Sequence, residues 1–267
     1  MKKIAIANQK GGIGKTFLSV NIAACLVKDY KKKVLFMDCD ASCNSTSYLN
    51  ATGEVPEKTI VDCLNGDVSI KDVIRQVSIP ETRGGRDFLT PIELYIIPSD
   101  IRVEELEFDD LNVIRDMIAE VEQDYDYCIF DCPSQKTSLT LVTLCACEHI
   151  LIPVNPEIDS VGGYGMMSDL VAKLRTGLMN ERLSIVGVVM NRIKPKQVLD
   201  NYIHTTLSEG AGKKVFLSSI RDSALVAQAR YFTKPLCYFR PTHPVTQDIQ
   251  AVTKELITKI NSMERGK

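Results

Sequence analysis

The segment from Lys10 to Thr16, Lys-Gly-Gly-Ile-Gly-Lys-Thr, constrains this chain more than any other. A G-x-x-x-x-G-K-[ST] loop needs glycines so that backbone N–H groups can turn toward phosphates, a lysine for the β/γ-phosphates and a hydroxyl for Mg²⁺. Gly14, Lys15 and Thr16 fill the last three of these places. The first glycine of the ordinary loop would stand at position 9, which is Gln9, and a second lysine, Lys10, follows it. The segment therefore predicts a variant phosphate-binding loop.

The sequence around this loop separates it from a plain glycine-rich turn. Residues 3 to 8 are apolar and β-prone, whereas residues 16 to 29 carry apolar side chains at helical spacing. A strand, a loop and a helix thus follow each other in the order that a phosphate-binding loop requires.

The rest of the chain alternates strand-like and helix-like segments. We expect strands at 3–8, 33–38, 93–97, 127–131, 149–154 and 185–190, with a weaker one near 214–217. We expect helices at 16–29, 109–123, 137–147, 160–177, 197–209, 223–230 and 244–263. This alternation predicts an α/β fold of the P-loop NTPase type, with a mostly parallel twisted sheet and helices on both faces. Ligands of such sheets bind at the carboxyl ends of the strands.

Residues 45 to 91 are the least regular part of the sequence, with several glycines and prolines. They predict short helices near 59–65 and 70–76, and a polar surface loop from Glu81 to Asp87. A length of 267 residues does not require a second domain, so we expect residues 1–267 to form a single ATPase domain.

Several classes of protein do not fit this composition. No apolar run reaches 18 residues, so we expect no helix that inserts stably into a membrane. The first strand begins at Lys3, which leaves no room for a signal peptide or an N-terminal DNA-reading domain, and predicts a cytoplasmic protein. Nine cysteines without any C-x-x-C pair are expected to stay reduced and to hold no metal.

Carboxylates follow two of the expected strands. Asp38 and Asp40 follow the expected strand segment 33–37, and at i and i+2 on a strand end they would face the same way, which suits Mg²⁺ and an attacking water. Two acids that cap the next loop are the alternative. Asp131 ends the strand 127–130, which is a Walker-B arrangement that holds Mg²⁺ directly or through water.

With these motifs the chain resembles the ParA/MinD family of ATPases. The resemblance implies ATP and Mg²⁺ as cofactors, with Asp40 positioning the hydrolytic water, Asp38 supporting the water shell of the metal, and Thr16 and Asp131 at the metal. It also implies that Lys10 reaches the phosphates of a partner subunit, so that catalysis by Lys10, Lys15 and Asp40 requires an ATP-bound homodimer. The expected nucleotide-binding residues of the loop are Gly11, Gly12, Ile13, Gly14, Lys15, Thr16 and Phe17.

Two later segments extend the resemblance. Glu157 and Ser160 match residues that hold the signature lysine before the dimer forms. The alternative is that Asp159 or Ser160 caps the helix that runs to residue 177. Asn191 and Arg192 match the adenine-contacting segment, where an amide suits the donor and acceptor of the base.

The sequence also departs from the family pattern. Phe17 stands where the family commonly has a hydroxyl residue that can contact the α-phosphate, Ala41 and Ser42 replace Pro-Gln, and Ser134 replaces a proline. We expect these departures to affect the rate of ATP hydrolysis and the affinity for the nucleotide.

The distribution of charge suggests a nucleic-acid surface. Residues 104 to 126 hold ten acids, whereas residues 192 to 240 hold nine Lys/Arg against three acids. Clustered cations bind DNA without sequence preference, and the alternative is a solvated face. The candidate DNA contacts are Lys194, Lys196, Lys213, Lys214, Arg221 and Arg230.

The function that this resemblance implies is DNA partitioning. The ATP dimer would bind non-specific nucleoid DNA in a bacterial cell, and a ParB-like or cargo-adaptor protein would stimulate slow hydrolysis. The alternative is a MinD-like or ParA-like ATPase that acts at a membrane or on a protein cargo. A third class, an iron–sulfur protein, would need a second cluster cysteine besides Cys132, and none is evident.

Overall fold

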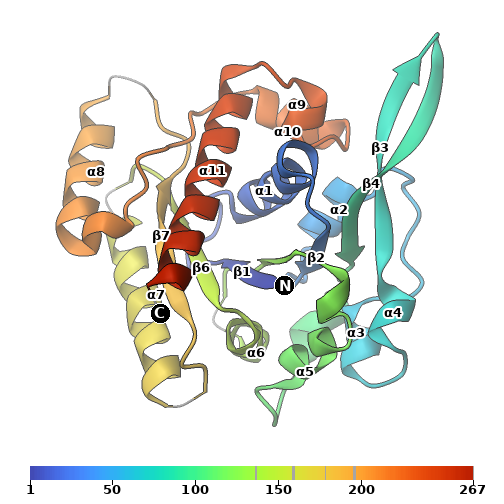
Figure 1. The fold of residues 1–267 in the computed structure, drawn as a ribbon, viewed down its shortest axis with the longest axis horizontal. Helices are drawn as coiled ribbons and strands as arrows, with labels where there is room; N and C mark the ends of the chain where they lie inside the picture. Colours follow the sequence, from blue (N-terminus) through green and yellow to red (C-terminus); the bar gives the residue numbers. More distant parts are fainter. Residues whose placement is uncertain (136, 158–159, 178, 195–196, 267) are drawn as a thin grey trace.

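One sheet organises the part of the chain that the computed structural model describes, residues 1–135, 137–157, 160–177, 179–194 and 197–266, with the backbone alone at 83, 160, 161 and 198. Within these residues, seven strands pair in the order β3-β4-β2-β5-β1-β6-β7 (Figure 1). All neighbours are parallel except β3 and β4. The strands are β1 Lys2–Ile6, β2 Val34–Asp38, β3 Arg75–Arg83, β4 Arg86–Ile97, β5 Tyr127–Asp131, β6 His149–Val154 and β7 Ser184–Met190. The predicted fold class is confirmed.

Both faces of the parallel part of the sheet are covered by helices, which explains the continuous apolar runs of the strands. Side chains alternate between two cores: Ile4 and Ile6 pack with one face, and Ala5 with the other. The first core lies under α1 (Lys15–Tyr30), α10 (Leu236–Phe239) and α11 (Pro244–Arg265). The second lies chiefly under α6 (Ser138–Ala146), α7 (Ser160–Thr176) and α8 (Val198–Ala211).

The other helices are short. They are α2 Asn44–Leu49, α3 Ile60–Leu64, α4 Ile70–Val73, α5 Val113–Ala119 and α9 Leu225–Tyr231, with 3₁₀ turns at Ile101–Glu105, Glu122–Asp124 and Gly212–Lys214. The expected helix 109–123 is thus shorter than predicted, because the α-helix covers only α5 and the chain then continues into a 3₁₀ turn. Among the described residues, no helix has both the length and the apolar character needed to cross a membrane.

The predicted surface loop at 81–87 is wrong. β3 and β4 form a long antiparallel hairpin that projects from the body of the molecule, and its turn lies at Gly84 and Gly85 (Figure 1). Both glycines have positive φ, 58° and 75°, which matches the turn of a tight hairpin. The segment looked irregular in the sequence because the outer half of the hairpin has little core to cover, so its strands lack a clear apolar alternation.

The weak strand expected near 214–217 is only an isolated bridge. Val215 bridges to Val188 of β7, and Phe216 N donates to Val188 O at 2.8 Å. A Cβ atom at Gly187 would lie 2.4 Å from Lys214 O and from the Phe216 ring. The absence of a side chain at Gly187 therefore allows this segment to lie against β7.

The strand ends of interest meet at one edge of the sheet. β1 leads into the phosphate loop, while β2 and β5 end at Asp38 and Asp131, which are register partners on neighbouring strands. β6 and β7 lead into the segments that hold Glu157 and Asn191. Since parallel strands share their direction, the fold gathers the predicted motifs at the edge where such sheets bind ligands.

Candidate functional site

The phosphate loop joins the carboxyl end of β1 to the first turn of α1. Gly14 caps α1 with a left-handed backbone, φ 88°, and Gly12 also has a positive φ of 72°. These conformations are open to glycine and strained for other residues. They turn the loop around the helix N-terminus, where free N–H groups and the helix dipole favour an anion.

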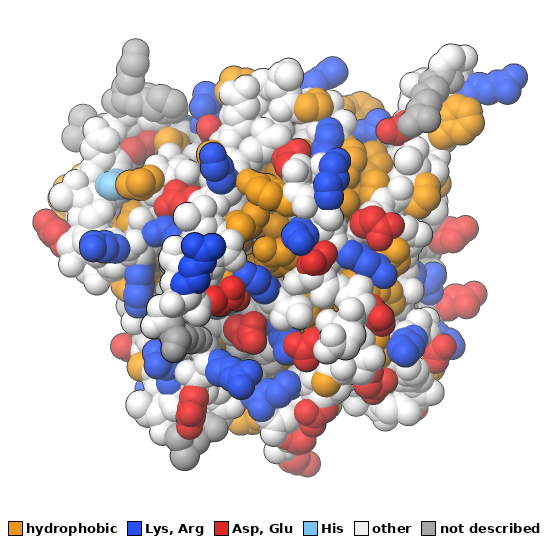
Figure 2. All heavy atoms as spheres, in the orientation of Figure 1, with side chains coloured by type: hydrophobic (Ala, Val, Ile, Leu, Met, Phe, Trp, Pro, Cys, Tyr) orange, Lys and Arg blue, Asp and Glu red, His pale blue; other side chains and the backbone are white. Residues whose placement is uncertain are grey.

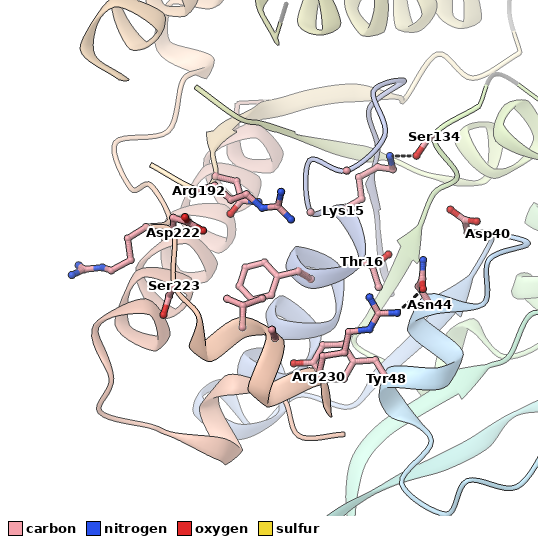
Figure 3. A pocket seen from close by; sticks show the side chains of 17 residues that line it. Lys15, Thr16, Asp40, Asn44, Tyr48, Ser134, Arg192, Asp222, Ser223 and Arg230 are labelled. Carbon is pink, nitrogen blue, oxygen red and sulfur yellow. Dashed lines mark hydrogen bonds between the residues drawn. The ribbon is translucent and has the colours of Figure 1, made fainter. Parts of the chain in front are cut away.

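A cavity of about 550 Å³ lies against this loop, within the size range of small-molecule sites (Figure 3). The lining comes from the loop and α1, from the segments after β2, β5 and β7, and from α9. It consists of Gly12, Gly14, Lys15, Thr16, Phe17, Asp40, Asn44, Tyr48, Ser134, Asn191, Arg192, Arg221, Asp222, Ser223, Val226, Ala227 and Arg230. The sequence analysis did not single out Asn44, Tyr48 or the Asp222–Ala227 segment as lining residues, because their place depends on how α2 and α9 pack.

Lys15 is held at the end of this cavity. Its ammonium donates to Lys10 O at 3.0 Å and to Ser134 Oγ at 2.7 Å. Burial lowers the pKa of Lys15, while the negative charges of Asp131 and Asp40 oppose that shift. Ser134, seen in the sequence only as a departure from a family pattern, is therefore a direct partner of the phosphate-loop lysine (Figure 3).

Lys10 is paired with Glu157 at the rim of the loop. Lys10 Nζ lies 2.5 Å from Glu157 Oε2, and the side chains are 30% and 53% exposed. The hydrogen bond from Lys10 lowers the pKa of Glu157. The structure thus brings these two predicted residues together, while the side chain of Ser160 and the whole of Asp159 lie outside what it describes.

Asn8 fixes the start of the loop. Its Oδ1 accepts from Lys10 N at 3.1 Å, and its Nδ2 donates to Pro153 O of β6 at 2.9 Å. A Cβ at Gly163 would approach Asn8 Oδ1 to 3.0 Å, so α7 lies close against this side chain. The sequence analysis missed Asn8, which followed the strand without any recognisable motif.

Asp38 and Asp131 form a buried pair of carboxylates. Asp38 Oδ2 accepts from Thr46 N and Oγ1 at 2.8 and 2.7 Å, and Asp131 Oδ2 accepts from Ser45 Oγ. Burial raises the pKa of both groups, and the neighbouring negative charge adds to the rise at Asp38. Two such carboxyl groups do not both ionise easily without a cation.

The chemistry of this corner fits Mg²⁺. Asp131 Oδ1 is a buried oxygen without a hydrogen-bond partner in the described part of the chain. Thr16 and Ser19, on the first turns of α1, lie near Asp131 and partly offset the rise of its pKa. Mg²⁺ commonly keeps several waters and uses one or two protein oxygens together with substrate phosphates, which is what Thr16 and Asp131 offer.

Asp40 occupies a different environment from Asp38. Asp40 is partly exposed and lines the cavity, whereas Asp38 is fully buried and faces Thr46. β2 ends at Asp38, so the strand alternation that predicted a common direction does not extend to Asp40. Ser42 N donates to Asp40 Oδ1 at 2.9 Å, so the Ala41-Ser42 departure still gives a turn that orients this carboxylate.

The far end of the cavity lies near Asn191 and Arg192. Asn191 is buried, and its Nδ2 donates to Ile13 O at 2.7 Å, while Arg192 has a left-handed backbone with φ 58°. Asn191 thus also ties the β7 end to the phosphate loop, a bond that the sequence did not indicate. Phe17 gives this part of the cavity an apolar wall.

The predicted DNA residues do not form one cluster. Lys194 lies before α8 and Lys213 and Lys214 lie after it, so they are separated by the length of a 14-residue helix, about 20 Å. Arg221 is bound to Asp248, and Arg230 lines the cavity. Lys196 lies outside the described residues. On the face drawn in Figure 2, basic and acidic side chains are interspersed.

Comparison with known proteins identifies the family of this chain. Residues 1–185 match the family model described as AAA domain. The sporulation initiation inhibitor protein Soj of Bacillus subtilis is 29% identical over 90% of this chain and 92% of its own length. The chromosome-partitioning ATPase Soj of Thermus thermophilus is 27% identical over 97% of both chains.

Solved structures share the fold. An ATP complex of a Cyanothece McdA variant superposes with a TM-score of 0.82 at 22% identity, covering 97% of this chain and 96% of that one. The cell division ATPase MinD of Pyrococcus furiosus gives a TM-score of 0.76 at 21% identity, covering 96% and 98%.

Proposed function

Because this chain belongs to the AAA domain family and, within it, to the ParA/MinD ATPases, we propose that it is a DNA-partitioning ATPase that cycles between an ATP-bound dimer and a monomer. The observation that carries the proposal is the Lys10–Glu157 pair at the rim of a phosphate loop whose own lysine, Lys15, already serves the cavity. The proposal treats residues 1–267 as one ATPase domain.

The proposed chemistry divides among the residues of the cavity. The N–H groups of the loop cradle the α- and β-phosphates, Lys15 neutralises the β- and γ-phosphates, and Asp40, which also lines the cavity, orients the attacking water. Mg²⁺, when held by Thr16 and Asp131 with Asp38 behind them, supplies further neutralisation of the phosphate charge. No strong general base lines the described part of the cavity, so intrinsic turnover is slow and a ParB-like partner accelerates it.

In this proposal, dimerisation adds Lys10 of a second copy to the positive charges around the phosphates. Lys10 is partly exposed and is not among the described lining residues of the cavity, so its ammonium can reach the phosphates of a second copy once it leaves Glu157. An exposed ion pair of this kind stabilises the chain by only about 0–1 kcal/mol, a small barrier against the gain of a phosphate contact.

We propose that the cargo is a DNA molecule, because one Soj relative is named a chromosome-partitioning ATPase and another a sporulation initiation inhibitor protein. Among the predicted contacts, the exposed lysines Lys194, Lys213 and Lys214 are proposed for non-specific DNA binding. The proposed location is the nucleoid in the bacterial cytoplasm. A protein cargo moved by the same cycle remains compatible with the site.

The membrane-acting alternative finds less support in the C-terminal helix. A MinD-like membrane helix would present its apolar stripe outward. In α11 the stripe of Val245, Ile249, Val252, Leu256 and Ile260 is buried against the sheet and α1. This helix is part of the core.

Co-sedimentation separates the two functions. The protein is mixed with random-sequence DNA or with anionic liposomes, each with ATP or ADP. Partitioning predicts ATP-dependent, salt-sensitive DNA binding that persists in Asp40→Ala and disappears in Lys10→Ala. Liposome binding without DNA binding would overturn the proposal in favour of a membrane-acting ATPase.

A further inference from the structure

Arg230 reaches into the nucleotide cavity from α9. Its guanidinium donates to Asn44 Oδ1 at 2.6 Å, and both side chains line the cavity, as Figure 3 shows. Asn44 is the first residue of α2 and follows the turn that orients Asp40. The bond therefore connects the C-terminal part of the chain to the segment that follows Asp40.

The charge of Arg230 is not neutralised by a carboxylate in the described part of the chain. Arg221, the neighbouring arginine of the cavity, gives two hydrogen bonds to Asp248 at 2.6 and 2.8 Å and is thereby paired. Arg230 instead rests on a neutral amide. A guanidinium that lines this cavity and has no carboxylate partner in the described part of the chain is suited to bind an anion, because Arg matches phosphate geometry with two parallel donors.

The position of Arg230 indicates which phosphate it can serve. The N–H groups of the loop cradle the α- and β-phosphates, Lys15 reaches the β- and γ-phosphates, and Thr16 serves the metal. Beyond Thr16 the lining side chain is Phe17, which has no donor. Arg230 lies beside Thr16 and Asn44 in Figure 3, where a guanidinium can add the side-chain donor that Phe17 does not offer to the α-phosphate.

We propose that Arg230 is a nucleotide-binding residue that moves in cis from Asn44 to the α-phosphate when ATP or ADP enters the cavity. This inference rests on the proposed ATPase function and assigns to nucleotide binding a cation that the charge pattern alone placed on a DNA surface. The α-phosphate is common to ATP and ADP, so Arg230 contributes to the affinity of both.

The test compares Arg230→Gln with Arg240→Gln by titration calorimetry with ATP and ADP in the presence of Mg²⁺. Arg240 is an exposed arginine that packs on Phe239 and does not line the cavity, so it controls for the loss of one positive charge. We expect Arg230→Gln to weaken both nucleotides by about tenfold, Arg230→Lys to weaken them less, and Arg240→Gln to change neither. Unchanged melting temperatures without nucleotide would show that both variants fold.

Four outcomes overturn the proposal. The first is equal affinity in Arg230→Gln and the wild type, and the second is a loss for ATP alone, which would move the contact to the γ-phosphate. The third is an equal loss in Asn44→Ala, which would make the Asn44 bond itself responsible, and the fourth is lost DNA binding with intact nucleotide affinity. A wild-type protein that binds neither nucleotide would instead overturn the ATPase function.

Discussion

Asp38 and Asp131 are register partners at the ends of β2 and β5, so two fully buried carboxyl groups lie side by side at the carboxyl edge of the sheet. Neither is paired with a lysine or arginine among the described residues, and Asp131 Oδ1 has no hydrogen-bond donor. Without a cation, such a pair lowers the stability of the folded chain, and a bound cation relieves the repulsion. This is a common compromise between stability and function.

The first prediction concerns the pH dependence of this pair. Burial raises both carboxyl pKa values above the ordinary value of about 4, so the folded state holds more protons than the unfolded state above that pH. The free energy of unfolding therefore falls as pH rises through the raised pKa values. We expect Asp131→Asn to make this fall shallower and to raise the melting temperature of the nucleotide-free protein in mildly alkaline buffer.

Thermal unfolding of Asp131→Asn and of Asp109→Asn, an exposed carboxylate, checks this expectation in acidic and alkaline buffer. Asp131→Asn is also expected to lose the extra stabilisation that ATP gives in the presence of Mg²⁺. A melting temperature that falls in Asp131→Asn without nucleotide would contradict the assignment of a repulsive pair.

A second prediction concerns the signature lysine. Glu157→Gln removes the charge that holds Lys10, and the pair is too exposed to contribute more than about 1 kcal/mol to stability. We expect an unchanged melting temperature and ATP-dependent dimers at lower protein concentration, by up to about fivefold, because Lys10 no longer has to leave a partner. Analytical ultracentrifugation with ATP measures this shift, and Lys10→Ala serves as the control that forms no dimer. Weaker dimerisation in Glu157→Gln would indicate that Glu157 acts in the dimer itself.

A third prediction follows from the contact between Lys15 and Ser134. Ser134→Ala removes one of two acceptors of a buried ammonium, and this lowers the pKa of Lys15 further than burial alone. Because phosphate binding uses the protonated lysine, ATP affinity should fall at a lower pH than in the wild type, with a loss of several-fold in alkaline buffer. Ser134→Thr retains the hydroxyl and should behave as the wild type. An identical pH profile in Ser134→Ala would show that the hydroxyl does not matter to Lys15.

A fourth prediction uses two glycines of the phosphate loop as a matched pair. Both have positive φ, but a Cβ at Gly12 would meet none of the described residues within 4 Å, whereas a Cβ at Gly14 would lie 2.4 Å from Asn191 Nδ2. We expect Gly12→Ala to cost about 1–2 kcal/mol of stability through its backbone alone, and Gly14→Ala to cost more. Chemical denaturation measures both, and Asn191→Ala should recover part of the loss in Gly14→Ala. Equal costs for the two glycines would place Asn191 farther from the loop.

The Lys10–Thr16 motif, Asp38 with Asp40, and Asp131 were recognisable in the sequence because each follows an apolar strand. The parallel sheet then brings strand ends together whatever the loops between them do. The contact of Lys10 with Glu157 was expected from the family resemblance, and the structure places the two side chains together. These features depend on local sequence and on one general rule of α/β architecture.

Other features depended on how distant segments pack. The sequence pattern predicts a loop where the structure has the hairpin at Gly84 and Gly85, because strands without a core to cover show no apolar alternation. The bond from Asn191 to Ile13 and that from Arg230 to Asn44 join segments 178 and 186 residues apart. No local pattern encodes such pairs.

The sequence by itself determined the nucleotide-binding fold, the phosphate loop and the acids at the strand ends, since each needs particular residue types in a short stretch of chain. The tertiary structure alone decided where the cations belong. It pairs Arg221 with Asp248, turns Arg230 into the cavity, and sets Lys194 apart from Lys213 by the length of α8. The physical reason is that the action of a charge depends on its nearest partners in space, and those come from elements that the sequence does not place relative to each other.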